Sequence, residues 1–368
     1  MKERREDELS IRLKERIRRE GAISFHDWMQ AALYDERDGY YRRTGMNPWG
    51  RAGDYRTSPE RSPLLAQTLA RFFAKVYEEL EKPARWTLWE SGAGAGHLAQ
   101  GVLESLKRSY PQIFSATRYV LDEASPAARA QAQQRLAPFG SSVEYLNLSA
   151  RTAPFDVGII FANELLDAFP VHRVTMSCGN LRELFVTTND AGEFVWMDVE
   201  PSTPRLSEYL ERLNVKLAEG QLAEISLHAE QWLRLAAASF KRGYLILIDY
   251  GAEATELYDV GLRPKGSLRA FRQHSLSEDV LQEPGRQDIT TTFDWTNVMK
   301  VCREMGLEIV SFERQDRFLM RAGLLEELAR MTEGDVSVAA SLSLSTTARE
   351  MILPGGMSQS FQVLSARK

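Results

Sequence analysis

The most chemically informative stretch of the chain is a strand-like segment followed by closely spaced glycines. Residues 86–98 read Trp-Thr-Leu-Trp-Glu-Ser-Gly-Ala-Gly-Ala-Gly-His-Leu, so Glu90 is followed by Gly92, Gly94 and Gly96. Glycines at alternate positions let the backbone bend tightly after a strand and approach a bound molecule, which a Cβ atom would block. The segment therefore predicts a turn that binds a nucleotide-containing cofactor.

The spacing of the glycines indicates which cofactor. The dinucleotide fingerprint G-x-G-x-x-G needs a third glycine where this chain has His97. An acidic residue followed by G-x-G-x-G fits S-adenosylmethionine better, because that molecule has no phosphate and carries a cationic amino-acid end beside its sulfonium. We predict that Glu90 lies near this positive charge. Taken alone, the motif has an alternative interpretation, in which the glycine-rich segment forms a tight turn and binds no cofactor.

Polar residues at the ends of the next two strands complete the predicted cofactor site. The second strand ends in Asp122-Glu123, where a doubly wound fold places an acid on a ribose hydroxyl pair, and we choose Glu123 for this role. Asn147 and Leu148, after the third strand, are expected near the adenine. A solvated acid before the helix that starts at Ser125-Pro126, and a plain turn at Asn147, are the structural alternatives.

The fourth strand is followed by a second group of acids, in Asn163-Glu-Leu-Leu-Asp-Ala-Phe-Pro170. Glu164 and Asp167 would share a face if the strand breaks into a helical turn. A pair of carboxylates can hold an arginine guanidinium, which stays protonated at neutral pH, and leave one of its nitrogens more nucleophilic. We therefore predict Asn163, Glu164 and Asp167 as catalytic residues; favourable acids at a helix N-terminus are the alternative.

Further polar residues are expected at the same edge. Asp249 closes a later aliphatic strand, and Arg269 and His274 belong to a polar segment that follows. For His274 and for Asp288 we keep the structural reading, because a lone histidine or acid more often makes a structural hydrogen bond. No metal and no covalent nucleophile are expected, since a sulfonium methyl is already activated.

Strands and helices alternate after residue 83, which is typical of a parallel sheet covered on both faces. We predict an α/β fold: a Rossmann-like sheet with helices on both faces, an N-terminal helical extension and an inserted lid made of a hairpin and helices. The expected parts are an extension over 1–82, core segments over 83–172 and 244–368, and the insertion over 173–243. Asn189-Asp-Ala-Gly192 indicates the hairpin turn.

Composition excludes several classes of protein. The 368 residues are 43% hydrophobic and 26% charged, which is ordinary for a globular protein, and a formal net charge of -5 gives no general attraction to nucleic acid. The two cysteines, Cys178 and Cys302, are too far apart in sequence for a metal or redox motif. No apolar run suggests a membrane span or a secretory signal, so a cytoplasmic protein without membrane insertion is expected.

Taken together, motifs along nearly the whole chain resemble the MidA family, also called the complex I assembly-factor methyltransferases. Besides the glycine turn, the matching segments are 23–29, 32–35, 39–41, 53–60, 163–170, 248–251, 266–269 with His274, 287–290, 354–357 and 361–364. Ser91, Ala93, Ala95 and Ser358 depart from the family's usual residues.

The resemblance implies a class I S-adenosylmethionine-dependent fold. For mitochondrial members it also implies symmetric dimethylation of an arginine on a respiratory complex I subunit. It further suggests that segment 53–60 folds over the cofactor, with Thr57 in contact.

We therefore predict a protein arginine N-methyltransferase with a protein substrate. A small-molecule O- or N-methyltransferase and a cofactor-binding assembly factor without turnover remain alternatives. A homodimer is also compatible with the sequence, which does not determine the oligomeric state.

Overall fold

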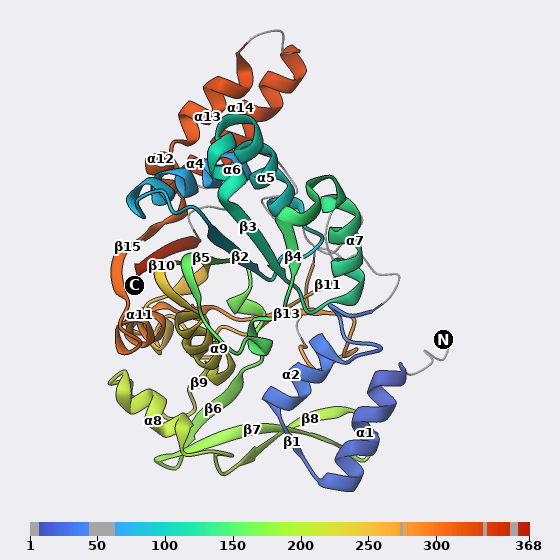
Figure 1. Cartoon of the computed structure of the whole chain (residues 1–368). Helices are drawn as coiled ribbons and strands as arrows, with labels where there is room; N and C mark the ends of the chain where they lie inside the picture. The colour runs from blue at the N-terminus through green and yellow to red at the C-terminus, as the bar shows by residue number, and fades with distance from the viewer. Residues whose placement is uncertain (1–6, 44–62, 273–274, 278, 334–336, 354–359) are drawn as a thin grey trace. The chain divides into compact units, whose positions relative to one another are not determined.

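The computed structural model describes residues 7–43, 63–272, 275–277, 279–333, 337–353 and 360–368 (Figure 1). The chain divides into two compact units, each built from three segments. Unit 1 comprises residues 1–55, 166–232 and 252–298, and unit 2 comprises residues 56–165, 233–251 and 299–368. Each unit is described by itself below.

Unit 2 is built on a mostly parallel sheet with the strand order β15-β16-β10-β5-β2-β3-β4. The strands are β2 (Trp86–Ser91), β3 (Thr117–Asp122), β4 (Val143–Tyr145), β5 (Phe155–Asn163), β10 (Phe240–Ala252), β15 (Glu308–Arg314) and β16 (Phe361–Arg367). β10, β5, β2, β3 and β4 run parallel, whereas β16 is antiparallel to both β10 and β15. This arrangement confirms the predicted α/β fold class.

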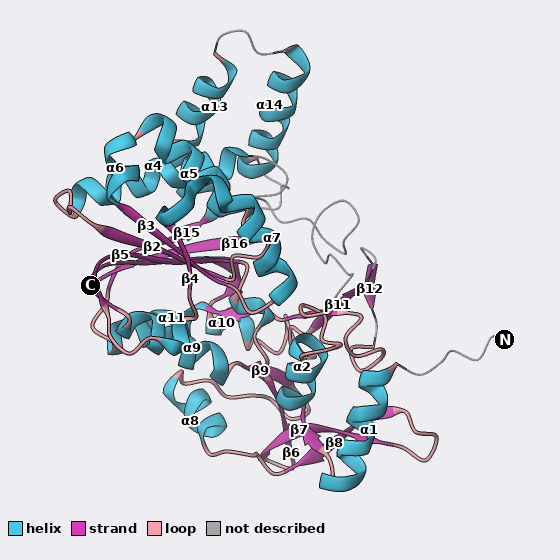
Figure 2. Cartoon of the chain, turned by 45° about the vertical axis from the view of Figure 1, so that its right-hand side comes forward, coloured by secondary structure: helices cyan, strands magenta, loops and turns pink. Residues whose placement is uncertain are grey.

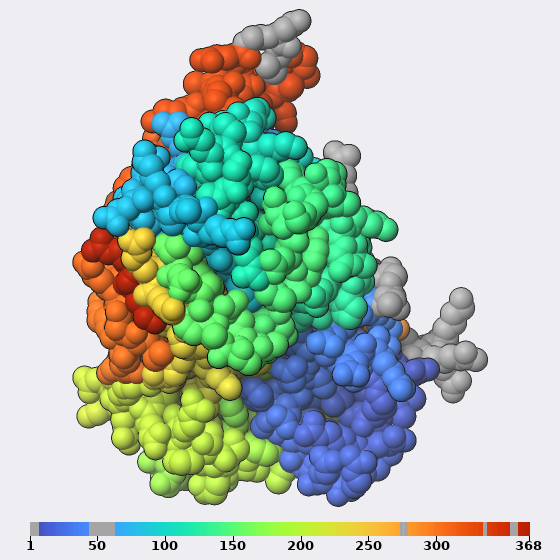
Figure 3. Space-filling view, in the orientation of Figure 1, coloured from blue at the N-terminus to red at the C-terminus, as the bar shows by residue number. Residues whose placement is uncertain are grey.

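Helices cover both faces of this sheet, with α4 and α5 on one face and α9 and α11 on the other (Figure 2). The helices are α4 (Pro63–Glu79), α5 (His97–Ser109), α6 (Pro111–Ala116), α7 (Pro126–Leu136), α9 (Leu227–Ala238), α11 (Trp295–Glu304), α12 (Gln315–Ala322), α13 (Leu324–Thr332) and α14 (Val338–Ile352). α9 and α11 each begin in unit 1. In the space-filling view, α4, α5 and α7 form a continuous surface coloured from light blue to green (Figure 3).

The core of unit 2 explains why its strands lack polar alternation. All six residues of β2 are buried, because both faces of the strand are covered. Trp86 and Leu88 point to the cluster that includes Leu69 and Phe73 of α4 and Val102 of α5. Side chains alternate across a strand, so Glu90 lies on the same face as Trp86 and Leu88. The strand thus delivers an acid, with apolar support, to the start of the glycine turn.

Unit 1 combines N-terminal helices with antiparallel sheets. It contains α1 (Glu8–Glu20), β1 (Ile23–Ser24), α2 (Phe25–Tyr34), η3 (Leu166–Ala168), β6 (His172–Ser177), β7 (Asn180–Thr188), β8 (Phe194–Val199), α8 (Arg205–Arg212), β9 (Leu222–Ile225), α10 (Ala254–Leu257), β11 (Arg269–Arg272), β12 (Ser275–Ser277), β13 (Asp288–Thr290) and β14 (Phe293–Asp294). β7 and β8 pair antiparallel around the turn at Asn189 and Gly192, which confirms the predicted hairpin. The strands β1, β6, β9, β11, β12, β13 and β14 are additional to those predicted.

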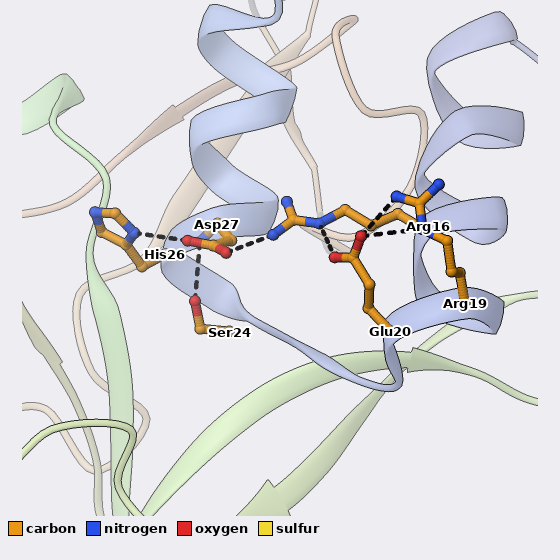
Figure 4. Close-up of polar contacts among 6 residues, drawn as sticks. All are labelled: Arg16, Arg19, Glu20, Ser24, His26 and Asp27. Carbon is orange, nitrogen blue, oxygen red and sulfur yellow. Dashed lines mark hydrogen bonds and ion pairs between the residues drawn. The ribbon is translucent and has the colours of Figure 1, made fainter.

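Charged contacts connect α1 to α2 (Figure 4). Arg16 donates to Glu20 within α1 at 2.9 Å and to Asp27 of α2 at 2.7 Å. Ser24 caps α2 by accepting the Asp27 N–H, which satisfies one of the backbone donors that a helix start leaves open. The contact with His26, together with Arg16, lowers the pKa of Asp27 to about 2. Asp27 therefore stays ionised and holds the two helices together.

Candidate functional site

The glycine turn lies between β2 and α5 in unit 2, and all three of its glycines have positive φ angles: +71° at Gly92, +53° at Gly94 and +77° at Gly96. A Cβ atom at Gly92 would lie 2.9 Å from Cδ1 of Leu165, and one at Gly96 would lie 3.1 Å from the Cβ of Ala132. Glycine is therefore required at these two positions because Leu165 and Ala132 lie too close to leave room for a side chain. A Cβ at Gly94, in contrast, would meet no atom of the described residues within 4 Å.

Gly94 thus presents bare backbone to open space at the carboxyl end of the central strand. This is the place at which ligands bind in open α/β sheets. The turn fits a cofactor that must approach the backbone closely, as the sequence predicts for S-adenosylmethionine. Among the described residues there is no group of three or more His, Cys, Asp and Glu side chains able to hold a metal.

Glu90 is buried directly before this turn. Its side chain is 3% exposed, and Oε2 accepts a hydrogen bond of 2.5 Å from the hydroxyl of Tyr119 on β3. Burial raises the pKa of Glu90 to about 8, because a carboxylate removed from water loses solvation. A nearby positive charge would favour its ionised form. The proximity of Glu90 to the cationic end of the cofactor remains a prediction. In that position, the positive charge would stabilise the carboxylate form that burial disfavours.

Glu123 fastens the glycine turn to the start of α7. Oε2 accepts the Gly94 N–H at 2.7 Å and Oε1 accepts the Ser125 N–H at 2.6 Å. Burial raises the pKa of this carboxyl group, and the two backbone donors oppose that shift. The carboxylate therefore lies beside the glycine with the open face. Its contact with a ribose stays a proposal, which this position supports.

Asp122, the neighbour of Glu123, also contacts the turn. Its carbonyl oxygen accepts the N–H groups of Gly92 at 2.8 Å and Ala93 at 3.3 Å. Its Oδ2 accepts the N–H of Leu148 at 3.2 Å, and burial raises its pKa to about 6. Asp122 directly precedes Glu123 at the end of β3, and this position could have indicated from the sequence that Asp122 belongs to the site.

The two residues predicted near the adenine have clear roles in local structure. Asn147 Oδ1 accepts the N–H of Ser149 at 2.9 Å and its hydroxyl at 2.6 Å, so the side chain caps the short η2 helix (Leu148–Ala150). The Leu148 side chain is buried, and its N–H is held by Asp122. The structure brings both residues to the edge of the sheet where Glu123 lies. Thr57 and His274 lie outside the described residues.

The end of β5 carries the first part of the predicted catalytic group. Glu164 has a φ angle of +53°, a left-handed conformation that is unfavourable for a residue with a side chain. Its N–H donates to the Ile248 carbonyl at 2.9 Å, and its Oε1 accepts the amide of Asn163 at 3.1 Å. The buried Oδ1 of Asn163 has no hydrogen-bond partner among the described residues. A strained backbone and an unsatisfied polar atom occur together here, as they often do at functional sites.

Asp249 holds this strained turn in place. Its side chain is 1% exposed; Oδ2 accepts the Leu165 N–H at 3.1 Å and Oδ1 accepts the Tyr250 N–H at 2.7 Å. Leu165 in turn packs against Gly92 of the glycine turn. The Glu164 backbone is thereby linked to the predicted cofactor turn through a single residue. We did not assign this role from the sequence, because it depends on contacts between distant strands.

Asp167, the second predicted carboxylate, belongs to unit 1. It lies in the short helix η3, which begins at Leu166, so the expected helical turn does not include Glu164. Burial raises the pKa of Asp167 to about 6, and the positive charge of Arg269 opposes that shift. Asp288 is buried in the same unit and accepts the hydroxyl of Tyr41 at 2.6 Å, in agreement with its structural reading.

Substitution of Gly94 tests the open face of the turn. We expect Gly94→Ala to weaken binding of S-adenosylhomocysteine, measured by calorimetry, by at least about tenfold, because the new Cβ would occupy the space that a ligand must approach. Gly140→Ala is the matched control: Gly140 has the same φ of +53°, and a Cβ there likewise meets no described atom within 4 Å. Equal losses of affinity in both variants would show that backbone strain, rather than ligand contact, explains the effect.

Comparisons with known proteins agree with this geometry. Residues 68–312, more than half of the chain, match the model of a family described as S-adenosyl-L-methionine-dependent methyltransferase. A COG1565 superfamily structure from Burkholderia thailandensis, bound to S-adenosyl-homocysteine, superposes with a TM-score of 0.87 at 28% identity and covers 98% of this chain and 92% of that chain. A native structure of a COG1565 protein from the same organism gives a TM-score of 0.83.

Curated relatives are similar over most of their length. The mitochondrial protein arginine methyltransferase NDUFAF7 homolog of Drosophila melanogaster is 25% identical over 81% of this chain and 70% of its own length. The NDUFAF7 protein of Danio rerio is 23% identical over 94% of this chain and 83% of its own length. The chain therefore belongs to the MidA family of S-adenosylmethionine-dependent methyltransferases.

Proposed function

We propose that this methyltransferase transfers the methyl group to an arginine nitrogen of a protein. Relatives that carry the name protein arginine methyltransferase support this acceptor. The observation on which the proposal depends is Glu164, whose left-handed turn is connected to the glycine turn by the contact between Leu165 and Gly92. A carboxylate in this position suits a guanidinium group, which has only donors to offer.

The bound cofactor would supply an electrophilic methyl group on its sulfonium. Glu90, Glu123 and the glycine turn would bind it, since they gather at the carboxyl end of β2 and β3. Glu164 would orient the guanidinium by accepting two of its N–H groups, which directs a remaining nitrogen toward the methyl carbon. Transfer would form an N–C bond on the arginine and release S-adenosylhomocysteine, whose sulfur would keep the electron pair of the broken C–S bond. The nitrogen then loses a proton to a carboxylate or to water.

Asn163 and Asp167 are further parts of this proposal. Asn163 donates to Glu164 and keeps its Oδ1 available to an N–H donor, which an arginine side chain provides. Asp167 is proposed as a second carboxylate for the guanidinium; it is buried and follows Glu164 by three residues, although the two do not share a helical turn. In the family's mitochondrial members the resemblance implies a complex I subunit as acceptor. For this chain we propose the arginine of a protein and leave the individual partner open.

Two further predictions concern the cellular location and the oligomeric state of the protein. No helix among the described residues is both long and apolar enough to cross a membrane. The similar curated proteins are mitochondrial by name. A cytoplasmic location and a homodimer stay predictions from the sequence.

A labelled-methyl experiment tests the proposed acceptor. The purified protein is incubated with S-adenosylmethionine labelled in its methyl group and an extract of cells that lack this chain. Acid hydrolysis of the protein fraction should yield labelled methylarginine. Label only in small molecules would support a small-molecule methyltransferase instead. Absence of label despite cofactor binding would favour an assembly factor without turnover.

The role of Glu164 is tested in the same assay. We expect Glu164→Gln to reduce methyl transfer at least about a hundredfold, as for the loss of a charged group that orients a substrate, while the affinity for S-adenosylhomocysteine changes less than about twofold. Glu144→Gln is the matched control, because Glu144 pairs with Arg118 elsewhere on the same sheet. Transfer by Glu164→Gln at the wild-type rate would contradict the proposed role.

Asp249 provides a test of how the Glu164 turn is held. In Asp249→Asn one of the two backbone N–H groups loses its acceptor, so the free energy of unfolding should fall by about 1–3 kcal/mol in urea titrations. Methyl transfer should fall as well, because the Glu164 turn loosens. Asp156→Asn is the control, since Asp156 on the same β5 forms an exposed ion pair with Lys241. An unchanged kcat in a destabilised Asp249→Asn would show that Asp249 does not position Glu164.

A further inference from the structure

The glycine turn is packed against α7 at its last residue. A Cβ atom on Gly96 would lie 3.1 Å from Cβ of Ala132 and 3.3 Å from Cδ1 of Leu136, both on α7. This close contact brings the last helical turn of α7 next to the backbone of Ala95. Arg135 directly precedes Leu136 in that helical turn. The glycine turn therefore has a cationic side chain beside it that sequence motifs do not reveal.

Arg135 makes three polar contacts at this junction. Its Nε donates to the carbonyl oxygen of Ala95 at 2.8 Å, and its Nη2 lies 3.0 Å from Nε2 of His97. Its Nη1 donates to Oε1 of Gln100 at 3.4 Å. One planar guanidinium thus connects the turn itself to the first helical residues of α5. Such a fork of donors fixes relative positions better than a single flexible ammonium would.

The geometry also determines the protonation of His97. A guanidinium nitrogen can only donate, so Nε2 of His97 must be the acceptor and its ring proton must reside on Nδ1. His97 is therefore neutral in this arrangement. Burial and the charge of Arg135 both lower the pKa of His97, which agrees with a neutral ring. The carboxylates bonded to neighbouring residues are Glu123, which accepts from Gly94, and Glu104, which accepts from Gln100.

We propose that Arg135 and His97 are positioning residues that hold the glycine turn in its cofactor-binding conformation. Asp122 and Glu123 bind the N–H groups at the start and middle of the turn, and Arg135 binds the carbonyl group near its end. His97 holds the guanidinium in the orientation that reaches Ala95. This assignment gives a function to the histidine that stands where the dinucleotide motif has glycine. It concerns cofactor binding and does not depend on the identity of the methyl acceptor.

Calorimetric titration with S-adenosylhomocysteine tests the role of Arg135. We expect Arg135→Met to raise the dissociation constant about tenfold, the change that corresponds to loss of one well-placed hydrogen bond. Arg108→Met is the matched control, because Arg108 is an exposed side chain in the last turn of α5, at the opposite end of that helix from the glycine turn. A dissociation constant of Arg135→Met within twofold of the wild type would overturn the proposal. Should this variant fail to fold, Arg135→Lys is measured instead: a dissociation constant raised several-fold supports the proposal, and one within twofold of the wild type overturns it.

The pH dependence of binding separates positioning from a purely structural role. Protonation of His97 removes its acceptor and places a second positive charge beside Arg135. Because burial and Arg135 lower the pKa of His97, wild-type affinity should fall only in acid, below the pH at which an ordinary imidazole is protonated. His97→Gln keeps an acceptor that cannot titrate; it should bind normally at pH 7.5 and lose less affinity in acid. Asp122 titrates in both proteins, so the difference between the two profiles is the readout. Identical acid profiles, or a His97→Gln that binds no better at pH 7.5 than His97→Leu, would refute the role of His97.

Discussion

The site depends on a five-residue turn whose backbone is held at every position. The Asp122 carbonyl accepts the N–H groups of Gly92 and Ala93, and the Glu123 carboxylate accepts that of Gly94. The Ala95 carbonyl accepts from Arg135. At Gly96 the close approach of α7 leaves no room for a side chain. A backbone fixed before a ligand arrives loses less conformational entropy on binding, which is the physical benefit of a preorganised site.

The same turn connects the predicted cofactor site to the predicted catalytic carboxylate. Leu165 packs on Gly92, and the N–H of Leu165 is bonded by the buried Asp249. Glu164 is therefore held in a left-handed conformation by Ile248 and Asp249 of β10 and, through Leu165, by the glycine turn. Strain of this kind persists only where surrounding contacts outweigh it. Its presence beside a cofactor turn supports a functional role for Glu164.

Much of unit 2 could be predicted from the sequence, because its signals are local. Ser125 and Pro126 predict the start of α7, and the structure places that helix at Pro126–Leu136, as expected. The glycine turn and the acid at the end of β3 were likewise visible from spacing. The strands β1, β6, β9 and β11 to β14 were not predicted. Apart from the six-residue β6, they have only two to four residues, which give too little periodicity to distinguish a strand from a loop.

The supporting residues of the site could not be found in this way. Arg135 lies on a helix rich in polar residues and reads as a surface side chain, although it contacts a residue 40 positions earlier. Asp249 reads as the end of a buried strand, and its partner Leu165 is 84 positions away. Glu164 and Asp167 were expected on one helical face, whereas the helical turn begins only after Leu165. Roles that arise from tertiary contacts leave no pattern in a single sequence.

Calorimetric titration of the wild-type protein with S-adenosylmethionine and, separately, with NAD tests the central claim most directly. The account predicts saturable, one-to-one binding of S-adenosylmethionine and no heat of binding from NAD. Binding of NAD, or of neither molecule, would contradict the assignment of the glycine turn as a site for S-adenosylmethionine.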